Sequence, residues 1–376
     1  MLFRAALVAV QVLLLLGLAE GSATVLEKLR PRDAELAFDY APYRMLRMSH
    51  APWPLNRDGF RARELETYRD HFVVEFLGGS VCLGVGTNTG PTVADHLQYA
   101  LDRLGLSRAQ VLNLCQGGAT SAQELAIFVQ YGLPIKPQVV LSLNGANDLL
   151  HPRPVGSDDA PNLPYRDREM RASFDGHHSV LSHLALVRLA GRLAARHPEN
   201  PAAHPPVPVN SVLDSYTYML EVTRQLAESS GATYAVLFQP TLHYRKKWSA
   251  GESSMWQQRD PQYGAATSAA VRETYSAADR YLSNWAKATG ANWIDLTNTF
   301  AGTPGTVYSD SVHFASEGGN LALFDELERR GLVADIEARY RVWERREREH
   351  SAGSPLVESR ARDASGHFSW EQRQLP

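Results

Sequence analysis

The strongest constraint on the fold of this chain is an alternation of strand-like and helix-like segments between residues 71 and 296. Short apolar runs suited to buried strands occur at 71–77, 110–115, 138–145, 233–240 and 292–296. Between them, residues 92–105, 121–132, 213–226 and part of 265–289 repeat apolar side chains three and four positions apart, as on one face of a helix. Such alternation indicates a parallel sheet with helices on both faces. We therefore predict one α/β domain with three layers, α/β/α, and a sheet of about five parallel strands.

The segments outside this alternation indicate an exported protein. The chain starts with a positive charge, continues with an uncharged apolar run from Ala5 to Ala19 and then small residues, as a secretory signal peptide does. An uncleaved membrane anchor at the N-terminus is the alternative. We expect a periplasmic or envelope protein with these parts: a leader or anchor at 1–23, an irregular lead-in at 24–69, the main domain at 70–345 with an insertion at about 151–209, and a disordered tail at 346–376.

Charge and cysteine content exclude two function classes. The formal net charge is −3, whereas nucleic-acid binders usually present a basic surface, so no nucleic-acid partner is predicted. The two cysteines, Cys82 and Cys115, lack the paired spacing of a structural zinc site. The histidines of DGHHSVLSH (175–183) have no carboxylate or cysteine spacing around them that supports a metal site. We predict neither a metal nor an organic cofactor.

A glycine-rich loop, FLGGSVCLGVG at 76–86, follows the first predicted strand. A phosphate-binding loop would need GxxxxGK followed by Ser or Thr, but Val85 and Gly86 occupy the last two of those positions. Ser80 is better placed as a nucleophile, because it lies at a turn from a strand into a helix, at the sheet edge where α/β proteins bind ligands. A serine nucleophile also needs a histidine base, a carboxylate and oxyanion donors.

Residues of these types follow the other predicted strands. Gly118 comes after the second strand and can present a bare backbone N–H, and Asn147 comes after the third and can donate from its amide. Asp310 and His313 come after the fifth strand, three positions apart, so that their side chains can meet across one turn. The carboxyl ends of parallel strands lie at one edge of the sheet, so we expect these residues to converge on Ser80.

The chain here resembles the SGNH (GDSL) hydrolase family. The matching blocks are GGS at 78–80, NxxxxGxTS at 113–121, GxND at 145–148 and DxxH at 310–313, and the likeness spans roughly residues 70–325. NRDGFR at 56–61 also looks like the lead-in of exported bacterial members. The resemblance implies a flavodoxin-like SGNH hydrolase fold and ester hydrolysis without a cofactor. It implies a triad of Ser80, His313 and Asp310, and an oxyanion hole formed by Ser80, Gly118 and Asn147.

The chain departs from the family pattern at Gly79, where members usually carry aspartate in a GDS block. This aspartate is not the triad acid, so its loss does not remove the expected catalysis. The segment between the third and fourth strands is also longer than in compact members, and we expect a lid or specificity surface there.

Three smaller features complete the sequence-based predictions. Cys82 and Cys115 lie at the same sheet edge if their strands are neighbours, and they form either a disulfide or two small buried hydrophobic residues. Ser121 and Glu124 are expected to form a capping box at the start of the second helix. His243 follows the fourth strand, where a contact with substrate is one interpretation, but it is expected to be a surface loop residue.

Together these features predict an exported serine esterase. Its expected substrate is a small-molecule or glycan ester that carries an O-acyl or O-acetyl group, on an envelope or extracellular carbohydrate. One alternative is an acyltransferase, in which a sugar hydroxyl replaces water at the same site. The other is a catalytically silent module of the same fold that binds glycans or assembles with envelope partners. The sequence does not indicate the oligomeric state.

Overall fold

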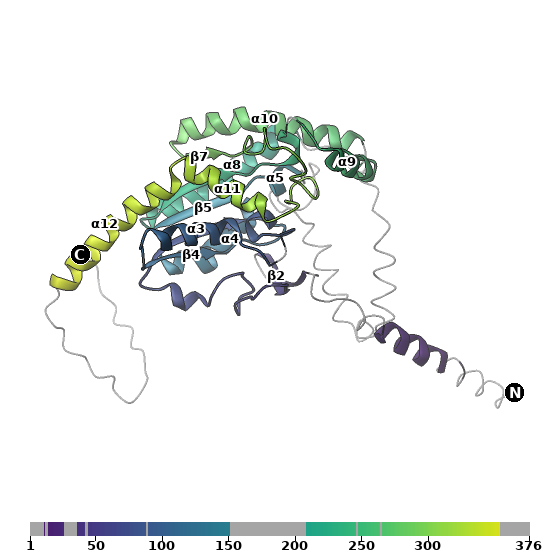
Figure 1. Ribbon diagram of the computed structural model, residues 1–376, viewed down its shortest axis with the longest axis horizontal. Helices are drawn as coiled ribbons and strands as arrows, with labels where there is room; N and C mark the ends of the chain where they lie inside the picture. Colours follow the sequence, from purple (N-terminus) through teal and green to yellow (C-terminus); the bar gives the residue numbers. More distant parts are fainter. Residues whose placement is uncertain are drawn as a thin grey trace.

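A parallel sheet of five strands forms the centre of the computed structural model (Figure 1). The model describes residues 11, 14–25, 36–41, 44–87, 89–150, 208–245, 247–263 and 265–353. The strands are β3 (Phe72–Gly78), β4 (Ala109–Asn113), β5 (Val139–Asn144), β6 (Thr233–Phe238) and β7 (Asn292–Asp295). They lie in the order β4-β3-β5-β6-β7, and each neighbouring pair is parallel. This is the flavodoxin-like 2-1-3-4-5 arrangement, and it confirms the predicted sheet.

Helices cover both faces of the sheet, so the three-layer prediction is also confirmed. One face packs against α3 (Val93–Arg103), α11 (Gly318–Arg329) and α12 (Leu332–Gly353); the other packs against α4 (Ser121–Ile127), α8 (Val209–Ser229) and α10 (Ala265–Thr289). Successive side chains of a strand point to opposite faces. In β3, Phe72 and Val74 therefore belong to the first core cluster, and Val73 and Leu77 belong to the second.

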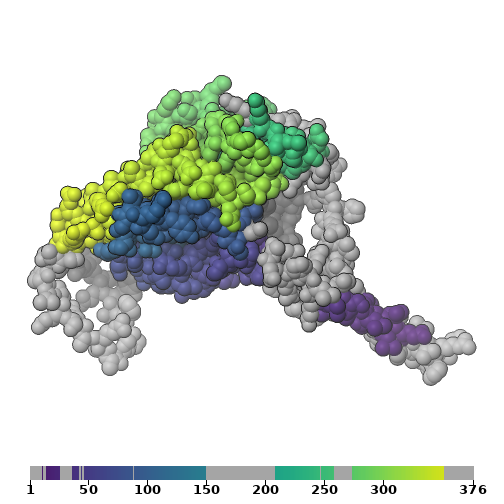
Figure 2. Space-filling model, viewed as in Figure 1, coloured from purple at the N-terminus to yellow at the C-terminus, as the bar shows by residue number. Residues whose placement is uncertain are grey.

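The lead-in is more regular than the sequence indicated. Strands β1 (Ala37–Ala41) and β2 (Met45–His50) form an antiparallel hairpin, and a short 3-10 helix, η1, follows at Leu65–Tyr68. Arg44, between the two strands, is buried, and its backbone carbonyl accepts a hydrogen bond from the Gln116 side chain at 3.2 Å. In the space-filling view the lead-in lies directly against α3, with α11 and α12 beyond it (Figure 2). The segment expected to be irregular is thus partly folded onto the domain.

The two ends of the chain are described in part. Residues 14–25 form a helix, and in the described part of the chain no helix is long and apolar enough to cross a membrane. At the other end, α12 continues to Gly353, so the first residues of the expected disordered tail are helical. The i,i+4 pair Arg348–Glu344 spans the start of this extension. Of the insertion predicted at about 151–209, residues 151–207 lie outside the described residues, as does the tail beyond 353; Val209 already begins α8.

The second helix ends earlier than the sequence indicated and continues in other forms. It ends as an α-helix at Ile127, runs on as a π-helical turn, η2 (Phe128–Gly132), and then as a 3-10 turn, η3 (Leu133–Ile135). Gly132 lies against the carboxyl group of Glu75 from β3, so closely that a Cβ at this position would overlap it. Burial raises the pKa of Glu75 well above its ordinary value. The π-helical turn therefore ends, at a glycine, directly beside a buried acidic side chain.

Candidate active site

The structure brings together the three residues expected to form a triad. Ser80 begins α2 (Ser80–Leu83), directly after β3. The His313 Nε2 atom lies 2.6 Å from the Ser80 Oγ atom, and the His313 Nδ1 atom lies 2.7 Å from an oxygen of Asp310. Serine, imidazole and carboxylate thus form one continuous hydrogen-bonded chain.

The carboxylate of Asp310 is held by its own turn. One of its oxygens accepts hydrogen bonds from the backbone N–H groups of Val312 and His313 at 2.8 and 2.7 Å, which leaves the other oxygen facing the imidazole. Burial alone would raise the pKa of Asp310. The hydrogen bond and charge of His313, together with the two amides, instead lower this pKa to about 2. Asp310 is therefore ionised at neutral pH, as a group that orients an imidazole must be.

The two residues expected to donate to an oxyanion, Gly118 and Asn147, also reach the same edge of the sheet. Gly118 has φ of 74°, a conformation that favours glycine, and Asn147 lies in α5 (Ala146–Leu150), which follows β5. The Asn147 amide donates to the carbonyl of Ala119 at 2.6 Å, so it is tied to the loop that carries Gly118. Within the described part of the chain, the N–H groups of Ser80 and Gly118 donate to no acceptor. Such amides can receive a developing oxyanion.

The glycine before Ser80 is explained by the position of Asn147. A Cβ at Gly79 would lie 2.6 Å from the Asn147 Nδ2 atom, well inside van der Waals contact. In this arrangement an aspartate at position 79 would displace the amide that lies beside Ser80. The absence of a side chain at Gly79 therefore leaves room for the Asn147 amide.

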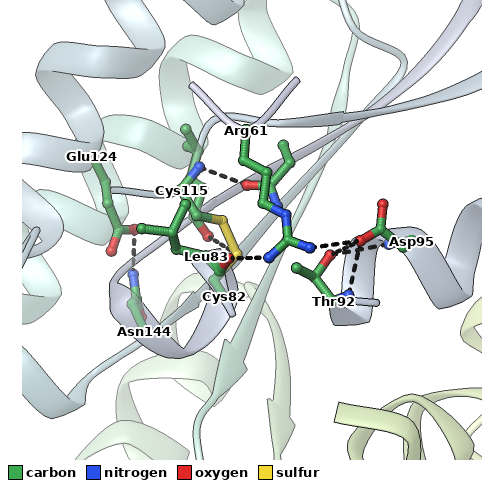
Figure 3. Close-up of a disulfide and its surroundings, with 10 residues drawn as sticks. Arg61, Cys82, Leu83, Thr92, Asp95, Cys115, Glu124 and Asn144 are labelled. Atoms are coloured by element: carbon green, nitrogen blue, oxygen red, sulfur yellow. Dashed lines mark hydrogen bonds and ion pairs between the residues drawn. A yellow bond between two sulfur atoms is a disulfide. The ribbon is translucent and has the colours of Figure 1, made fainter. Parts of the chain in front are cut away.

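Cys82 and Cys115 are joined in a disulfide (Figure 3), which decides between the two alternatives open at the sequence level. Their Cα atoms are 5.7 Å apart, within the usual range for a bridge, and both residues are buried. Cys82 belongs to α2, and Cys115 precedes the Gly118 loop. The bridge thus connects the segment of the candidate nucleophile to that of a candidate oxyanion donor.

Arg61, at the end of the NRDGFR motif, contacts the same region. Its guanidinium donates to the carbonyl of Leu83 at 3.2 Å and to that of Gly90 at 2.7 Å (Figure 3 draws the Leu83 bond). It also stacks over Trp53, with 4.6 Å from its central carbon to the ring centroid. Leu83 ends α2, so Arg61 satisfies a backbone carbonyl at the end of that helix. The family resemblance marked this motif, but sequence reasoning gave it no structural role.

A buried polar network lies beneath the site, on the α4 and α8 side of the sheet. Asn144 donates to Glu124 at 2.6 Å and accepts from the Tyr216 hydroxyl at 2.6 Å. Burial, with the charge of Asp148 added, raises the pKa of Glu124 to about 8. Burial also raises the pKa of Asp148 to about 6, although Ser121 donates to it from both its hydroxyl and its amide. Glu124 is thus largely protonated at neutral pH.

This network corrects the predicted capping box. The box at the start of α4 consists of Thr120 and Gln123, whose side chains satisfy each other's backbone N–H groups. Ser121 and Glu124 are one position further along, and their side chains point into the buried network. Both pairs have the same three-residue spacing, so the sequence alone did not separate them.

His243 is half-buried and not a surface loop residue as expected. Its ring stacks on Tyr275 with centroids 5.0 Å apart and 2° between the planes, and it meets Trp256 edge to face at 5.1 Å. Its ring partners Trp256 and Tyr275 lie 13 and 32 residues further along the chain, so the sequence near His243 gave no local signal of this packing.

No cluster of three or more potential metal ligands occurs among the residues that the structure describes. The histidines at 177, 178 and 183 lie outside those residues.

Comparison with known proteins gives likenesses of fold at low identity. No protein-family model matches the chain, and a search of curated proteins finds no match. Among solved structures, an acetylxylan esterase from Geobacillus stearothermophilus is 16% identical, with 70% of this chain and 94% of that chain covered and a TM-score of 0.42. A second acetyl xylan esterase is 14% identical, with 69% and 98% covered and a TM-score of 0.39. An alpha/beta hydrolase enzyme from the metagenome of Lake Arreo, Spain, is 13% identical, with 71% and 98% covered and a TM-score of 0.40. At these values the function has to be argued from the site itself.

Proposed function

We propose that this chain is a serine esterase of the SGNH type. The observation that carries the proposal is the hydrogen-bonded chain Ser80–His313–Asp310, at the sheet edge where Gly118 and Asn147 present N–H donors. Four sequence blocks that resemble the SGNH family supply these residues in the family's order. Each of the five residues alone has a structural explanation, such as a position at a helix N-terminus or in a turn. Their occurrence together at one sheet edge is explained by a single catalytic site.

In the proposed reaction, His313 accepts the Ser80 proton as Oγ attacks the ester carbonyl. The negative charge that develops on the carbonyl oxygen is stabilised by the N–H groups of Ser80, Gly118 and the Asn147 side chain. Asp310 orients the imidazole and stabilises its protonated form. His313 then returns the proton to the departing alcohol, which leaves an acyl group on Ser80. A water molecule, activated by His313, hydrolyses this acyl-enzyme and releases the carboxylic acid.

We further propose that the substrate is an O-acyl or O-acetyl ester on an envelope or extracellular carbohydrate, and that the protein acts after export. The apolar leader of the sequence supports export, and the disulfide is of the kind that persists in oxidising compartments. The substrate class rests on export together with the family resemblance. The esterase proposal itself does not depend on it.

The decisive experiment compares wild type, Ser80→Ala and Ser316→Ala on p-nitrophenyl esters of increasing chain length and on O-acetylated sugars. Ser316 is an exposed serine and provides the matched control. We expect wild type and the control to hydrolyse short esters and to react with a fluorophosphonate, and Ser80→Ala to do neither. Acetyl transfer to a sugar hydroxyl that exceeds hydrolysis would favour the acyltransferase. Wild type that neither hydrolyses esters nor labels would favour a silent binding module.

A further inference from the structure

The segment that carries Asp310 and His313 is far from the end of its strand. β7 ends at Asp295, and residues 296–317 contain no strand or helix apart from an isolated bridge between Tyr308 and Phe314. A connection of this length has to be held by contacts with other parts of the molecule if its side chains are to keep a fixed geometry.

Residues 307–315 form a small hairpin, here called the Asp–His hairpin. The Ala315 N–H donates to the Val307 carbonyl at 2.8 Å, and the Ser309 N–H donates to the His313 carbonyl at 2.9 Å. Asp310 and His313 lie at its tip and Val307 and Tyr308 at its base. The position of the tip therefore depends on how the base is fixed.

Glu252 fixes the base. It lies in the first turn of α9 (Ala250–Tyr263), and one oxygen of its carboxylate accepts the N–H groups of Val307 and Tyr308 at 3.0 and 3.1 Å. The other oxygen accepts the N–H of Ser249 at 2.8 Å, and the Glu252 N–H donates to the Ser249 hydroxyl at 3.1 Å. This reciprocal pair is a capping box. The same side chain thus begins α9 and holds the Asp–His hairpin.

Arg245 completes the attachment. Its guanidinium pairs with Glu252 and donates to the backbone carbonyls of Thr303 and Gly305, each at 2.6 Å. The side chain of Arg245 is only 3% exposed and that of Glu252 is fully buried. A short 3-10 turn, η6 (Leu242–Tyr244), precedes Arg245, and the Leu242 N–H donates to Ser311 at the hairpin tip at 3.0 Å. Base and tip are therefore both attached to residues 242–252.

We propose that the buried Arg245–Glu252 ion pair is a positioning unit that sets the alignment of His313 with Ser80. The pair touches neither Ser80 nor His313, and it acts through the backbone of the Asp–His hairpin. This role rests on the proposed function for its effect on catalysis, whereas its effect on the hairpin is independent of any reaction. A misplacement of about 1 Å is enough to cost about 10²-fold in rate.

The test compares Glu252→Gln and Glu252→Ala with two controls in the full chain. Glu221→Gln makes the same change of charge in a partly exposed helical pair with Arg224, and Leu282→Ala removes buried core volume away from the hairpin. All are assayed on p-nitrophenyl acetate below their melting temperatures, and amide hydrogen exchange is measured for residues 303–314. Glutamine keeps an acceptor for the two amides, so it is the conservative variant.

We expect kcat to fall about 10-fold in Glu252→Gln and about 10²-fold in Glu252→Ala, with KM within about twofold of wild type. Exchange at 303–314 should be faster in both variants and unchanged in the two controls. The proposal is overturned if Glu252→Ala keeps the wild-type kcat and exchange rate, or if Leu282→Ala loses as much kcat at an equal loss of melting temperature. Wild type without esterase activity would refute the proposed function alone, and hydrogen exchange would still decide whether Glu252 holds the hairpin.

Discussion

The two sides of the candidate site are held in different ways. Ser80, Gly118 and Asn147 come two, five and three residues after the ends of β3, β4 and β5, so strand geometry and short backbone turns place them. Asp310 comes fifteen residues after β7, and its hairpin depends on side chains from another segment. The sheet therefore supplies the first half of the site almost directly, while the second half is assembled by tertiary contacts.

The interactions that hold the two sides in place also differ. The Ser80 side is braced by a covalent bond, the disulfide, and by Arg61, which donates to two backbone carbonyls. The Asp–His side relies on a buried ion pair, and removal of one partner would leave the other as an unpaired buried charge. We expect changes on the Asp–His side to affect activity through alignment and charge, and changes on the Ser80 side to act through the space around the oxyanion donors.

The largest effect is expected from Asp310→Asn, which changes the charge behind the imidazole but keeps the size of the side chain. In the variant, the amide oxygen can still accept from the two backbone N–H groups, which leaves the amide nitrogen facing His313 Nδ1. This nitrogen cannot accept a hydrogen bond, so the imidazole loses the tautomer that leaves Nε2 free to accept from Ser80. We expect kcat on p-nitrophenyl acetate to fall about 10⁴-fold. A fall of less than about 10-fold would show that Asp310 does not orient His313.

The same variant also tests the electrostatics of the Asp–His side. The pKa of Asp310 is lowered from 3.8 to about 2, so its ionised form stabilises the folded state above about pH 4, and this contribution is lost as the pH falls towards 2. The melting temperature of Asp310→Asn should therefore lie furthest below wild type near neutral pH, with the difference shrinking between pH 4 and 2. A difference independent of pH would contradict this account.

A smaller effect is expected from Gly79→Ala on the Ser80 side. The new methyl group would displace the Asn147 amide, and loss of one oxyanion donor costs about 10²- to 10³-fold in kcat. Gly302→Ala is the matched control, because nothing lies within 4 Å of a Cβ at that position. Wild-type kcat in Gly79→Ala would show that Asn147 adapts, and would remove the explanation offered for the GGS block.

The smallest effect on activity is expected from Glu124→Gln. This residue belongs to the buried polar network with Asn144 and Tyr216, which lies beneath the site. The pKa of Glu124 is raised from 4.5 to about 8, so the folded state binds a proton that the unfolded chain releases, and stability falls as the pH rises across this interval. Glutamine mimics the protonated acid. We expect the variant to gain roughly 4 kcal/mol of stability relative to wild type at pH 8 and little at pH 4.5. Parallel melting curves across pH would contradict this expectation.

The sequence predicted the parts of the molecule that depend on local patterns. Apolar runs located the five strands to within one or two residues, and strand-end positions marked Ser80, Gly118 and Asn147 as candidate site residues. The DxxH spacing marked Asp310 and His313 as further candidates. It did not show what holds them, because Arg245 and Glu252 lie some sixty residues earlier and only the folded chain brings them to the hairpin. The burial of polar side chains such as Glu75 and Glu124 was also not predicted, because acidic residues are usually exposed to solvent.

The disulfide closes a ring of chain from Cys82 to Cys115 that contains α3 and β4. A single proteolytic cut inside this ring would leave two fragments that stay joined, with Ser80 on one and Gly118, Asn147, Asp310 and His313 on the other. The nicked molecule would run as one band on a non-reducing gel and as two after reduction. A site composed of two peptides could thus survive a break in the very segment that links its halves.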